Sequence, residues 1–537
     1  MLNKRAAEKF LKLMDEAQDA AHEHHSRMRH ELAIYNNRSA YVDGTSIGNV
    51  SPITHESLNP EIQKGILRLV PGFTEQAARI ELLPDRSRHS VADAENIEDL
   101  KQWTQMFQEV DREGERLEDA VYHNLIFGHA ISKAVYDPRY RVVRMIPISP
   151  LAFSADPDAT STDLSNAGFL VHETTQNERY IRYHYPDYKI SESKTGSILD
   201  NENRQFRIRE LWMRRWIAEM QGITVKDAGD TEIFYAAAID NDVVRVRTTP
   251  YYYPDFPFAT WRNFPAIKHS SKQSRSFWGH GYGALCWSQQ KFLDEVYSNL
   301  ILMLRRLSIG RMISKRGALD MEQVFTGYGV NIEVEEEYDL DRDIKPFPTE
   351  AVPPILYNLL EHSIKGIADM MPSLNPVFAG QSPSSNASGR MVNTLQWAAF
   401  NQISNNVREM NEFRLHRMRL LISLTQQFAR RPLAPHIWRR GIDFPDSFRD
   451  EARYIGYRMK MPDATSLPNT PAGKLEIAQI MAALGAQMSI SELIKFVGFD
   501  SGYGWDDDTF SQPVQPTGSG GNPLNQNVAS GMDVGMI

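Results

Sequence analysis

The chain has 537 residues, of which 42 % are hydrophobic, so it can bury several packed layers and is expected to divide into two or more parts. Its 59 lysines and arginines stand against 68 aspartates and glutamates, a net charge of -9, which excludes the broad basic surface of a tight duplex binder. The single cysteine, Cys286, excludes an intrachain disulfide framework, suits a reducing cytoplasm and is expected to be a buried thiol. No apolar run approaches the roughly 18 residues of a membrane span, and the charged N-terminus lacks a signal-peptide core, so we expect a soluble protein.

The first 130 residues are predicted to be mostly helical. Apolar side chains recur every three or four residues from position 3 to about position 36, without Pro or Gly, and predict one amphipathic docking or oligomer helix. After a link rich in Gly, Asn, Ser and Pro come a short helix and the strand-like segment ARIELLP. Residues from about 93 to 129 are expected to form one further helix.

The hydrophobic period then changes to that of strands. β-branched and aromatic residues dominate seven segments separated by turns. These segments are SKAVYD, RVVRMIPI, GFLVHET, YIRYHYP, FRIRELWMRRWI, EIFYAAAI and VVRVRTTPYYY. Because strands joined by short turns pair in opposite directions, this region predicts a mostly antiparallel sheet and an α+β fold.

Helical periodicity returns in the C-terminal half. Residues 282–307 and 352–371 are predicted helices that flank a compact, β-leaning insert. A third predicted helix spans about 390 to 430, which at about 1.5 Å per residue is roughly 60 Å long. EARYIGYRMKM is a strand candidate, two short helices follow it, and residues from about 511 onward are expected to be a disordered tail.

Four short motifs that suggest chemistry are each incomplete. HEHH at residues 22–25 lacks the second histidine of the HExxH zinc motif, and a solvated helix face is the simpler interpretation. DPDATSTDLSNAG begins like a calcium loop but has Ala167 where the bidentate Glu belongs, so it predicts a turn between strands. GHGYG at 279–283 predicts a flexible entry to the next helix, and Gly473-Lys474 lacks the P-loop spacing. We therefore predict no cofactor and no metal site.

Charge is unevenly distributed along the C-terminal half. The insert between the first two helices holds seven carboxylates within eleven positions, which suggests either a solvated edge or a charged docking face. They are Glu333, Glu335, Glu336, Glu337, Asp339, Asp341 and Asp343. Arginines accumulate on the third helix and beyond it, where ion pairing and nucleic-acid contact both fit the pattern: Arg408, Arg414, Arg417, Arg419, Arg430, Arg431, Arg439 and Arg440.

Several segments in a fixed order resemble a known protein family. They are GHGYGALCWSQQKFLDEVYSNLI, the β-leaning insert, ILYNLLEHSIKGIADMM, the loop ending NASGRMVNTL, the long helix and GYRMKMPDATSLPNTPAGKLEIAQIMAALGAQMSISELIKFVGF. Upstream, IFGHAISKAVYDPRYRVVRMIPISPLAFSADPDAT fits the same order. This order resembles the portal protein, or head-to-tail connector, of tailed bacteriophages, most closely that of short-tailed phages. The resemblance covers most of the chain up to about residue 505 and rests on order and short motifs.

The resemblance implies a structural protein and not an enzyme. Portal proteins form rings, typically of twelve copies, at one capsid vertex, through which double-stranded DNA enters and leaves without sequence-specific contact. The implied partners are further copies of this chain, the terminase large subunit, the tail adaptor, and the major capsid and scaffolding proteins, with no membrane. The implied location is the virion, after assembly in the host cytoplasm.

The resemblance also divides the chain. Residues 1–281 look like the N-terminal helix and wing, 282–307 and 352–371 like two stem helices, and 308–351 like the clip, whose seven carboxylates would dock the terminase and later the tail adaptor. The remaining parts are 372–389 as the tunnel loop, 390–462 as the long wing helix and a strand, 463–510 as a crown, and 511–537 as the tail.

The tunnel loop is the segment that the resemblance places on the DNA channel. Small uncharged groups can pass along phosphates, whereas a wall of lysines would bind them by counterion release. The channel residues implied in this way are Gln381, Ser382, Ser384, Ser385, Asn386 and Arg390. Ser388 can cap the long helix, and Arg390 at its start is expected to pair with a neighbouring subunit rather than with DNA.

Two other classes of protein stay open at this point. One is a capsid or tail-interface protein without a DNA channel. The other is a nucleic-acid enzyme, which would need clustered carboxylates to hold a metal, and Asp156, Asp158 and Asp163 are its candidates.

Overall fold

The computed structural model describes residues 4–36, 60–74, 80–84, 91–110, 113–138, 141–190, 205–223, 232–265, 276–308, 312–314, 344–346, 353–374, 403–428 and 457–460. All of them belong to the first of two compact units, Met1–Pro462, and the second unit is Asp463–Ile537. The predicted crown and tail therefore lie outside the described residues.

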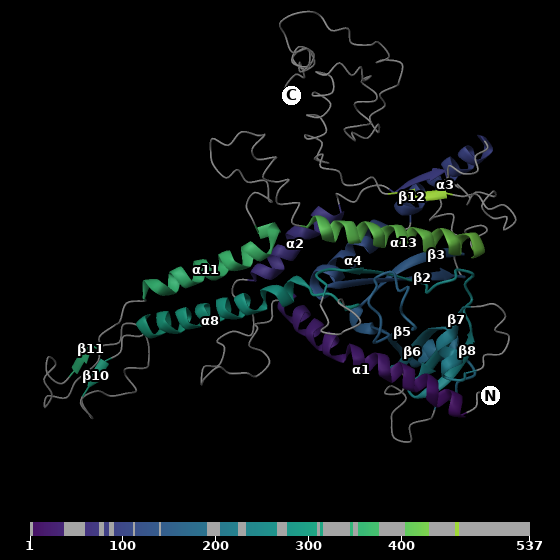
Figure 1. Cartoon of the computed structure of the whole chain (residues 1–537). Helices are drawn as coiled ribbons and strands as arrows, with labels where there is room; N and C mark the ends of the chain where they lie inside the picture. The colour runs from purple at the N-terminus through teal and green to yellow at the C-terminus, as the bar shows by residue number, and fades with distance from the viewer. Residues whose placement is uncertain are drawn as a thin grey trace, which may run out of the picture. The chain divides into compact units, whose positions relative to one another are not determined.

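The described part contains both helices and strands, as Figure 1 shows, and the predicted α+β class is confirmed. The helices are α1 (Lys4–Tyr35), α2 (Glu61–Thr74), α3 (Val91–Val110), α4 (Glu113–Phe127), α5 (Glu178–His184), α7 (Arg215–Met220), α8 (Tyr282–Ser308), α11 (Pro354–Met370) and α13 (Ser404–Phe428), with short 3-10 helices η1 (Pro150–Ala152) and η2 (Pro372–Leu374). The strands are β1 (Glu81–Pro84), β2 (His129–Asp137), β3 (Val142–Ile148), β4 (Phe153–Ala155), β5 (Phe169–Asn177), β6 (Gln205–Arg214), β7 (Ile233–Ile239), β8 (Asp242–Thr248), β9 (Phe258–Arg262), β10 (Met312–Ser314), β11 (Ile344–Pro346) and β12 (Tyr457–Lys460).

The strand pairs of the described part are antiparallel, as predicted. A five-stranded sheet has the order β4-β5-β6-β7-β8, and a three-stranded sheet has the order β3-β2-β9. Two further pairs are β1 with β12 and β10 with β11. In the first of these, Leu82 is opposite Met459, so segments far apart in the sequence share one ladder.

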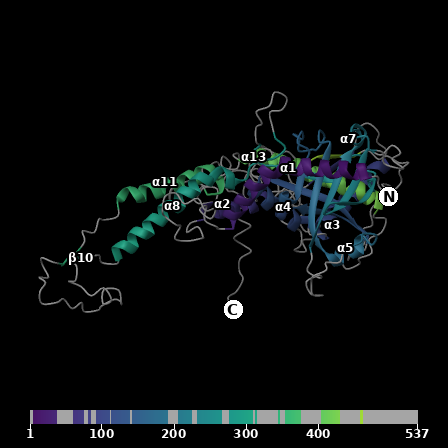
Figure 2. The same ribbon diagram turned by 90° about the horizontal axis from the view of Figure 1, so that it is seen from below.

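Helix α1 covers one face of the five-stranded sheet and crosses it in Figure 2. Its apolar residues Phe10 and Met14 belong to the same buried cluster as Leu211 of β6. Beside this cluster, Arg209 of β6 donates a hydrogen bond to the carboxylate of Asp15 at 2.6 Å. The predicted amphipathic helix is confirmed, and its apolar stripe packs within the same chain.

The opposite face of the five-stranded sheet packs against the three-stranded sheet. Side chains alternate across a strand, so Trp212 of β6 points away from α1, and its ring centre lies 5.9 Å from that of Phe258 of β9. On the far side of the three-stranded sheet, Trp261 of β9 and Tyr136 of β2 contact aromatic rings of α13. The layers therefore follow the order α1, five-stranded sheet, three-stranded sheet and α13 (Figure 1).

Two of the predicted strands are wrong, wholly or in part. YIRYHYP lies in helix α5, because the side chain of Asn177 caps this helix by accepting a hydrogen bond from the Tyr180 N–H at 2.9 Å. Glu178 in the first turn and Arg182 in the last turn complement the helix dipole. The end of FRIRELWMRRWI likewise leaves the sheet and forms α7.

Three further predictions are corrected or completed by the structure. The single helix predicted at 93–129 is two helices, α3 and α4, and Glu113 and Glu115 in the first turn of α4 favour the second start. The sequence pattern did not indicate β4 and β9, because both strands are buried on both faces and show no alternation. The helix predicted at 390–430 is described as α13, and its first part lies outside the described residues.

Candidate functional site: the α8–α11 helix pair

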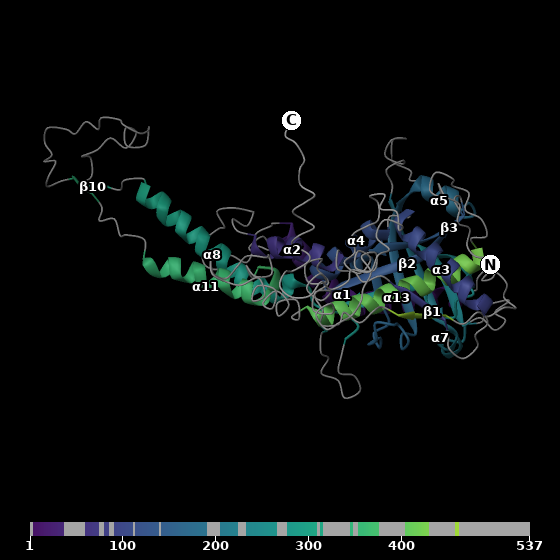
Figure 3. The same cartoon turned by 90° about the horizontal axis from the view of Figure 1, so that it is seen from above.

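Helices α8 and α11 are the two helices predicted at 282–307 and 352–371, and both are confirmed as helices. They lie side by side in Figures 1, 2 and 3. The end of α8 leads to β10 and the start of α11 follows β11, and these two strands pair antiparallel. The two helices therefore run in opposite directions as one hairpin.

The residues predicted to carry function lie outside the described part of the chain. The seven carboxylates Glu333, Glu335, Glu336, Glu337, Asp339, Asp341 and Asp343 fall between β10 and β11 in the sequence. The channel residues Gln381, Ser382, Ser384, Ser385, Asn386 and Arg390, with Ser388, fall between η2 and α13. Their roles stay predictions.

The end of the pair nearest the layers has a buried side. Leu293 and Val296 of α8 and Ile367 of α11 are buried. Beside them Gln290 donates a hydrogen bond to Asp294 at 3.1 Å, and both of these polar side chains are buried one turn apart on α8. This end of the hairpin is therefore packed like a protein core.

Helix α2 holds the end of α11. A β-carbon at Gly65 would overlap the side chain of Met371, so the absence of a side chain there lets the two elements approach. The hydroxyl of Ser373 donates a hydrogen bond to the Gly65 carbonyl at 2.7 Å, and Ser373 is fully buried. The contact of the Met371 side chain with Gly65 and a buried hydrogen bond thus hold this end of the pair.

The thiol of Cys286 lies one turn into α8 and is fully buried, as predicted. Burial raises the pKa of this thiol to about 12. The thiol therefore stays protonated near neutral pH, and the nucleophilic thiolate is scarce.

Both helices of the pair carry apolar side chains that stay exposed. They are Leu285, Phe292 and Leu304 of α8 and Ile355, Tyr357 and Met370 of α11. Ile355 is 62 % exposed, and Leu285 and Phe292, seven residues apart, lie on the same face of α8. Exposed apolar side chains on both helices make the pair a candidate for contact with another molecule.

A partly buried ionic cluster joins the two sheets. Lys133 of β2 pairs with the carboxylate of Glu210 of β6, which also lies 3.1 Å from Nδ1 of His172 and accepts a hydrogen bond from Tyr235 at 3.0 Å. Burial alone would raise the pKa of Glu210, but the charge of Lys133 and the hydrogen bond of His172 outweigh it and hold the pKa well below its ordinary range. The carboxylate is thus ionised and paired, which suits a cross-link between layers.

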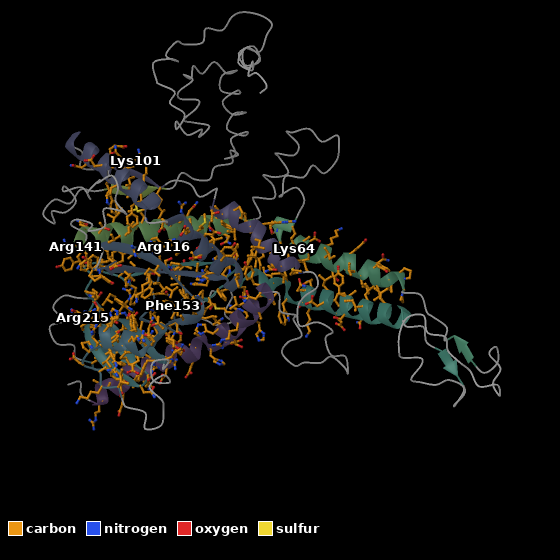
Figure 4. All side chains as sticks on the ribbon, turned by 180° about the vertical axis from the view of Figure 1, so that it is seen from behind. Lys64, Lys101, Arg116, Arg141, Phe153 and Arg215 are labelled. Atoms are coloured by element: carbon orange, nitrogen blue, oxygen red, sulfur yellow. The ribbon has the colours of Figure 1, made fainter. Side chains whose placement is uncertain are left out.

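The HEHH segment is only partly a solvated face. His22 is exposed, whereas the rings of His24 and His25 lie 5.9 and 5.7 Å from that of Trp278. Nε2 of His25 is 2.9 Å from the carbonyl oxygen of Phe153, which lies in the interior in Figure 4. These histidines serve the packing of α1 on the segment that precedes α8.

The calcium-like segment is a turn between β4 and β5, as predicted. The carboxylate of Asp156 accepts hydrogen bonds from the backbone N–H groups of Asp158 at 3.0 Å and Gly168 at 2.7 Å. Asp163 accepts one from the N–H of Ser165 at 2.9 Å. Two of the three candidate metal-binding carboxylates therefore hold the turn together. In the described residues, no three His, Cys, Asp or Glu side chains gather closely enough to hold a metal ion.

Two of the arginines of α13 make polar contacts within the chain. Arg417 is buried and pairs with Glu113 of α4 at 2.6 Å. Arg408 donates a hydrogen bond to the side chain of Asn405 at 2.9 Å on the exposed side. Ion pairing is therefore the role of Arg417. The described part of the chain does not include Arg430, Arg431, Arg439 and Arg440.

The glycine-rich segment is confirmed as the entry to α8, and its glycines pack closely against the rest of the chain. Its flexibility stays a prediction. A β-carbon at Gly279 or Gly281 would overlap backbone atoms of the turn between α4 and β2. The sequence pattern did not indicate a role for Arg27 and Glu31 of α1, which contact this glycine-rich segment. Their only signal is the spacing of an Arg and a Glu four residues apart on a helix.

Comparison with known proteins identifies no family for this chain. No family model matches it, and no curated protein matches it. Among solved structures it is similar to a chain from the neck of a native gene transfer agent particle computed with C12 symmetry. The two chains are 13 % identical, the match covers 82 % of this chain and 90 % of that chain, and the TM-score is 0.33. A likeness of this size establishes neither a shared fold nor a shared function. Among the described helices, none has the length and apolarity needed to cross a membrane.

Proposed function

We propose that this chain is the subunit of a head-to-tail connector, or portal: a structural protein that closes into a ring at one capsid vertex and lets double-stranded DNA pass. The supporting observation is the α8–α11 pair, whose apolar side chains stay exposed in the single chain. Water contact with these side chains is unfavourable, and neighbouring copies would remove it.

A closed ring explains why both helices carry exposed apolar residues. In a cyclic assembly each subunit contacts two neighbours through two different surfaces, because the interface is head-to-tail. Phe292 of α8 and Tyr357 of α11 are 41 % and 52 % exposed, so each helix of the pair can supply one of the two surfaces. Binding to a single partner molecule would need only one such surface.

The remaining assignments follow from the resemblance of the sequence. Residues 282–307 and 352–371 would form the stem, 308–351 the clip that docks the terminase large subunit and then the tail adaptor, and 372–389 the tunnel loop. A net charge of -9 and the small polar side chains of the loop would keep the channel from trapping phosphates. The ring would act through its geometry, and an ATP-consuming motor would be a separate protein.

The proposal is tested by imaging and by changing the pair. We expect the purified protein to form rings in negative-stain images, with a central hole about as wide as a DNA duplex. Replacing Leu285 and Phe292 together with Asp should abolish the rings and give single subunits in mass photometry, because buried unpaired carboxylates are costly. The matched control replaces Tyr183 and Met220 with Asp, since these side chains are 70 % and 75 % exposed on α5 and α7, outside the pair.

The possible outcomes separate the classes of function. If the wild-type protein is monomeric, or forms solid particles without a hole, it does not form a channel. Solid particles would favour another capsid or tail-interface protein. Rings that persist in the Leu285 and Phe292 variant show that the pair is not the interface. Clear nuclease activity of the pure protein would instead support a nucleic-acid enzyme.

A further inference from the structure

The first turn of α8 is held in a close joint between α1 and the turn that links α4 to β2. Gly281 leaves no room for a side chain, because a β-carbon there would overlap the carbonyl oxygen of Ile126 and lie 3.1 Å from Oε2 of Glu31. A β-carbon at Gly283 would lie 3.2 Å from the side chain of Glu31. Gly128, on the other side of the joint, has a φ of 74°, which favours glycine. The backbone at the start of α8 therefore rests directly on Glu31.

The carboxyl group of Glu31 pairs with the guanidinium of Arg27, which also binds this backbone. Nε of Arg27 lies 3.4 Å from Oε1 of Glu31, and the same guanidinium donates a hydrogen bond from its NH2 group to the carbonyl of Gly279 at 2.6 Å. Glu31 is only 2 % exposed. One guanidinium thus links the carboxyl group and the loop, and water contributes little.

The other titratable groups around the joint come from four elements and from the loop itself. His24 belongs to α1, His280 to the loop, His129 to β2, Arg262 to β9 and Tyr282 to α8. Burial, with smaller contributions from the charges of Arg262 and His24, lowers the pKa of His129 to about 3. Burial and Arg27 also lower the pKa of His280, and burial raises that of Tyr282 above its ordinary range. These two histidines and this tyrosine are therefore neutral near pH 7.

Glu31 titrates near neutral pH in the closed joint. Burial raises its pKa to about 7, against the opposing effects of Arg27 and of the Gly281 N–H. In water a glutamate has its ordinary pKa of 4.5. The closed joint therefore prefers the protonated acid, and an open, hydrated joint prefers the carboxylate.

We propose that the contact between α1 and the Gly279–Gly283 loop is a pH-dependent joint, which holds the start of α8 firmly while Glu31 is protonated and loosens as Glu31 ionises. The sign follows from linkage: a carboxyl group with a raised pKa stabilises the closed state at acid pH, and this stabilisation is lost as the pH rises toward the raised value. Because α8 and α11 pack together, the joint sets how firmly the hairpin is anchored. The inference concerns one chain and does not depend on ring formation.

The single cysteine provides a probe of the joint in the unmodified protein. Cys286 is fully buried one turn after Gly283, so a thiol reagent reaches it only when the start of α8 opens. The rate of reaction with 4,4′-dithiodipyridine, divided at each pH by the rate for the urea-unfolded chain, measures the open fraction. This ratio removes the ordinary effect of pH on thiol reactivity.

We expect the open fraction of the wild type to rise by roughly 50-fold between about pH 5 and about pH 8, for an acid with a pKa of about 7 in the closed joint. In Glu31→Gln, which cannot ionise, it should stay flat and close to the acid-side value of the wild type. The matched control is Glu16→Gln, an exposed position on the same helix, which should keep the wild-type profile.

Three outcomes would overturn the proposal. If the open fraction of the wild type does not change with pH, the joint does not respond to pH. This result comes from the wild type alone, so it holds even if Glu31→Gln fails to fold. A Glu31→Gln variant that keeps the wild-type dependence assigns the response to another group. Opening that increases toward acid pH assigns it to the buried histidines, because their protonation has the opposite sign. The thiol reaction can be measured on single subunits and on rings alike. A negative result would therefore contradict the pH-dependent joint without bearing on the proposed ring.

Discussion

Trp261 of β9 donates a hydrogen bond from its indole nitrogen to Oδ1 of Asn406 on α13 at 2.8 Å, and both residues are buried. Asn406 in turn donates to the side chain of Asn124 on α4 at 3.2 Å, and Asn124 donates to the backbone carbonyl of Trp261 at 3.2 Å. Three elements that are distant in the sequence are thus closed into one ring of hydrogen bonds inside the core.

Replacing Asn406 with Leu should break this ring of hydrogen bonds. The indole N–H of Trp261 and the amide of Asn124 would lose a partner in a buried place, so we expect a loss of about 1–3 kcal/mol in the free energy of unfolding. Urea unfolding followed by tryptophan fluorescence would measure it. Asn405→Leu, at the exposed neighbouring position, is the control and should change stability little; equal losses in both variants would contradict the account.

Glu210 should make the protein sensitive to acid. Its pKa is depressed in the folded chain, so its stabilising effect is complete above the ordinary carboxyl pKa of 4.5 and is lost as the pH falls below that value. Glu210→Gln should cost about 3 kcal/mol at pH 7, because Lys133 would be left buried without its anion. It should also flatten the dependence of the urea midpoint on pH below about pH 4.5. Glu219→Gln, on an exposed pair with Arg215, should leave both quantities unchanged.

Gly281→Ala tests how tightly the start of α8 is packed. The added methyl group would overlap the carbonyl oxygen of Ile126, and overpacking of this kind costs about 1–3 kcal/mol. Gly114→Ala is the matched control, because no atom outside its neighbours lies within 4 Å of a β-carbon there. At that helical position alanine should stabilise by up to about 1 kcal/mol. Thermal unfolding of both variants measures the contrast, and a stable Gly281→Ala protein would show that the joint has room.

Deleting residues 380–387 separates the proposed tunnel loop from the proposed ring interface. If the loop faces the channel, the deletion should leave ring formation nearly intact and reduce DNA packaging or retention. Negative-stain imaging and a packaging assay together measure the two effects. A deletion variant that cannot form rings would show that the loop serves assembly.

The positions of α1, α8 and α11 could be predicted from the sequence because their apolar residues keep a helical period over many turns. Helix α5 could not be predicted, because YIRYHYP has the composition of a strand and the cap that starts the helix, Asn177, lies before it. Strand β9 is buried on both faces, so its residues carry no alternation for a pattern to reveal.

The candidate site, too, could be predicted from the sequence only in part. The apolar character of the α8–α11 pair is visible in the sequence, whereas its exposure depends on which side chains the rest of the chain covers. The contact of Glu31 with the loop before α8 joins residues some 250 positions apart, as the Arg27 to Gly279 hydrogen bond shows. Local periodicity contains no information about such a pair.

By itself the sequence determined the α+β class, the antiparallel pairing, the long helices, the buried lone cysteine and the net negative charge, because these depend on composition and on periods of a few residues. The tertiary structure alone decided the order of the four layers, the ionic cluster around Glu210 and the burial of Glu31 against glycine backbone. Such features depend on contacts between distant segments, and burial sets the dielectric environment that shifts each carboxyl pKa.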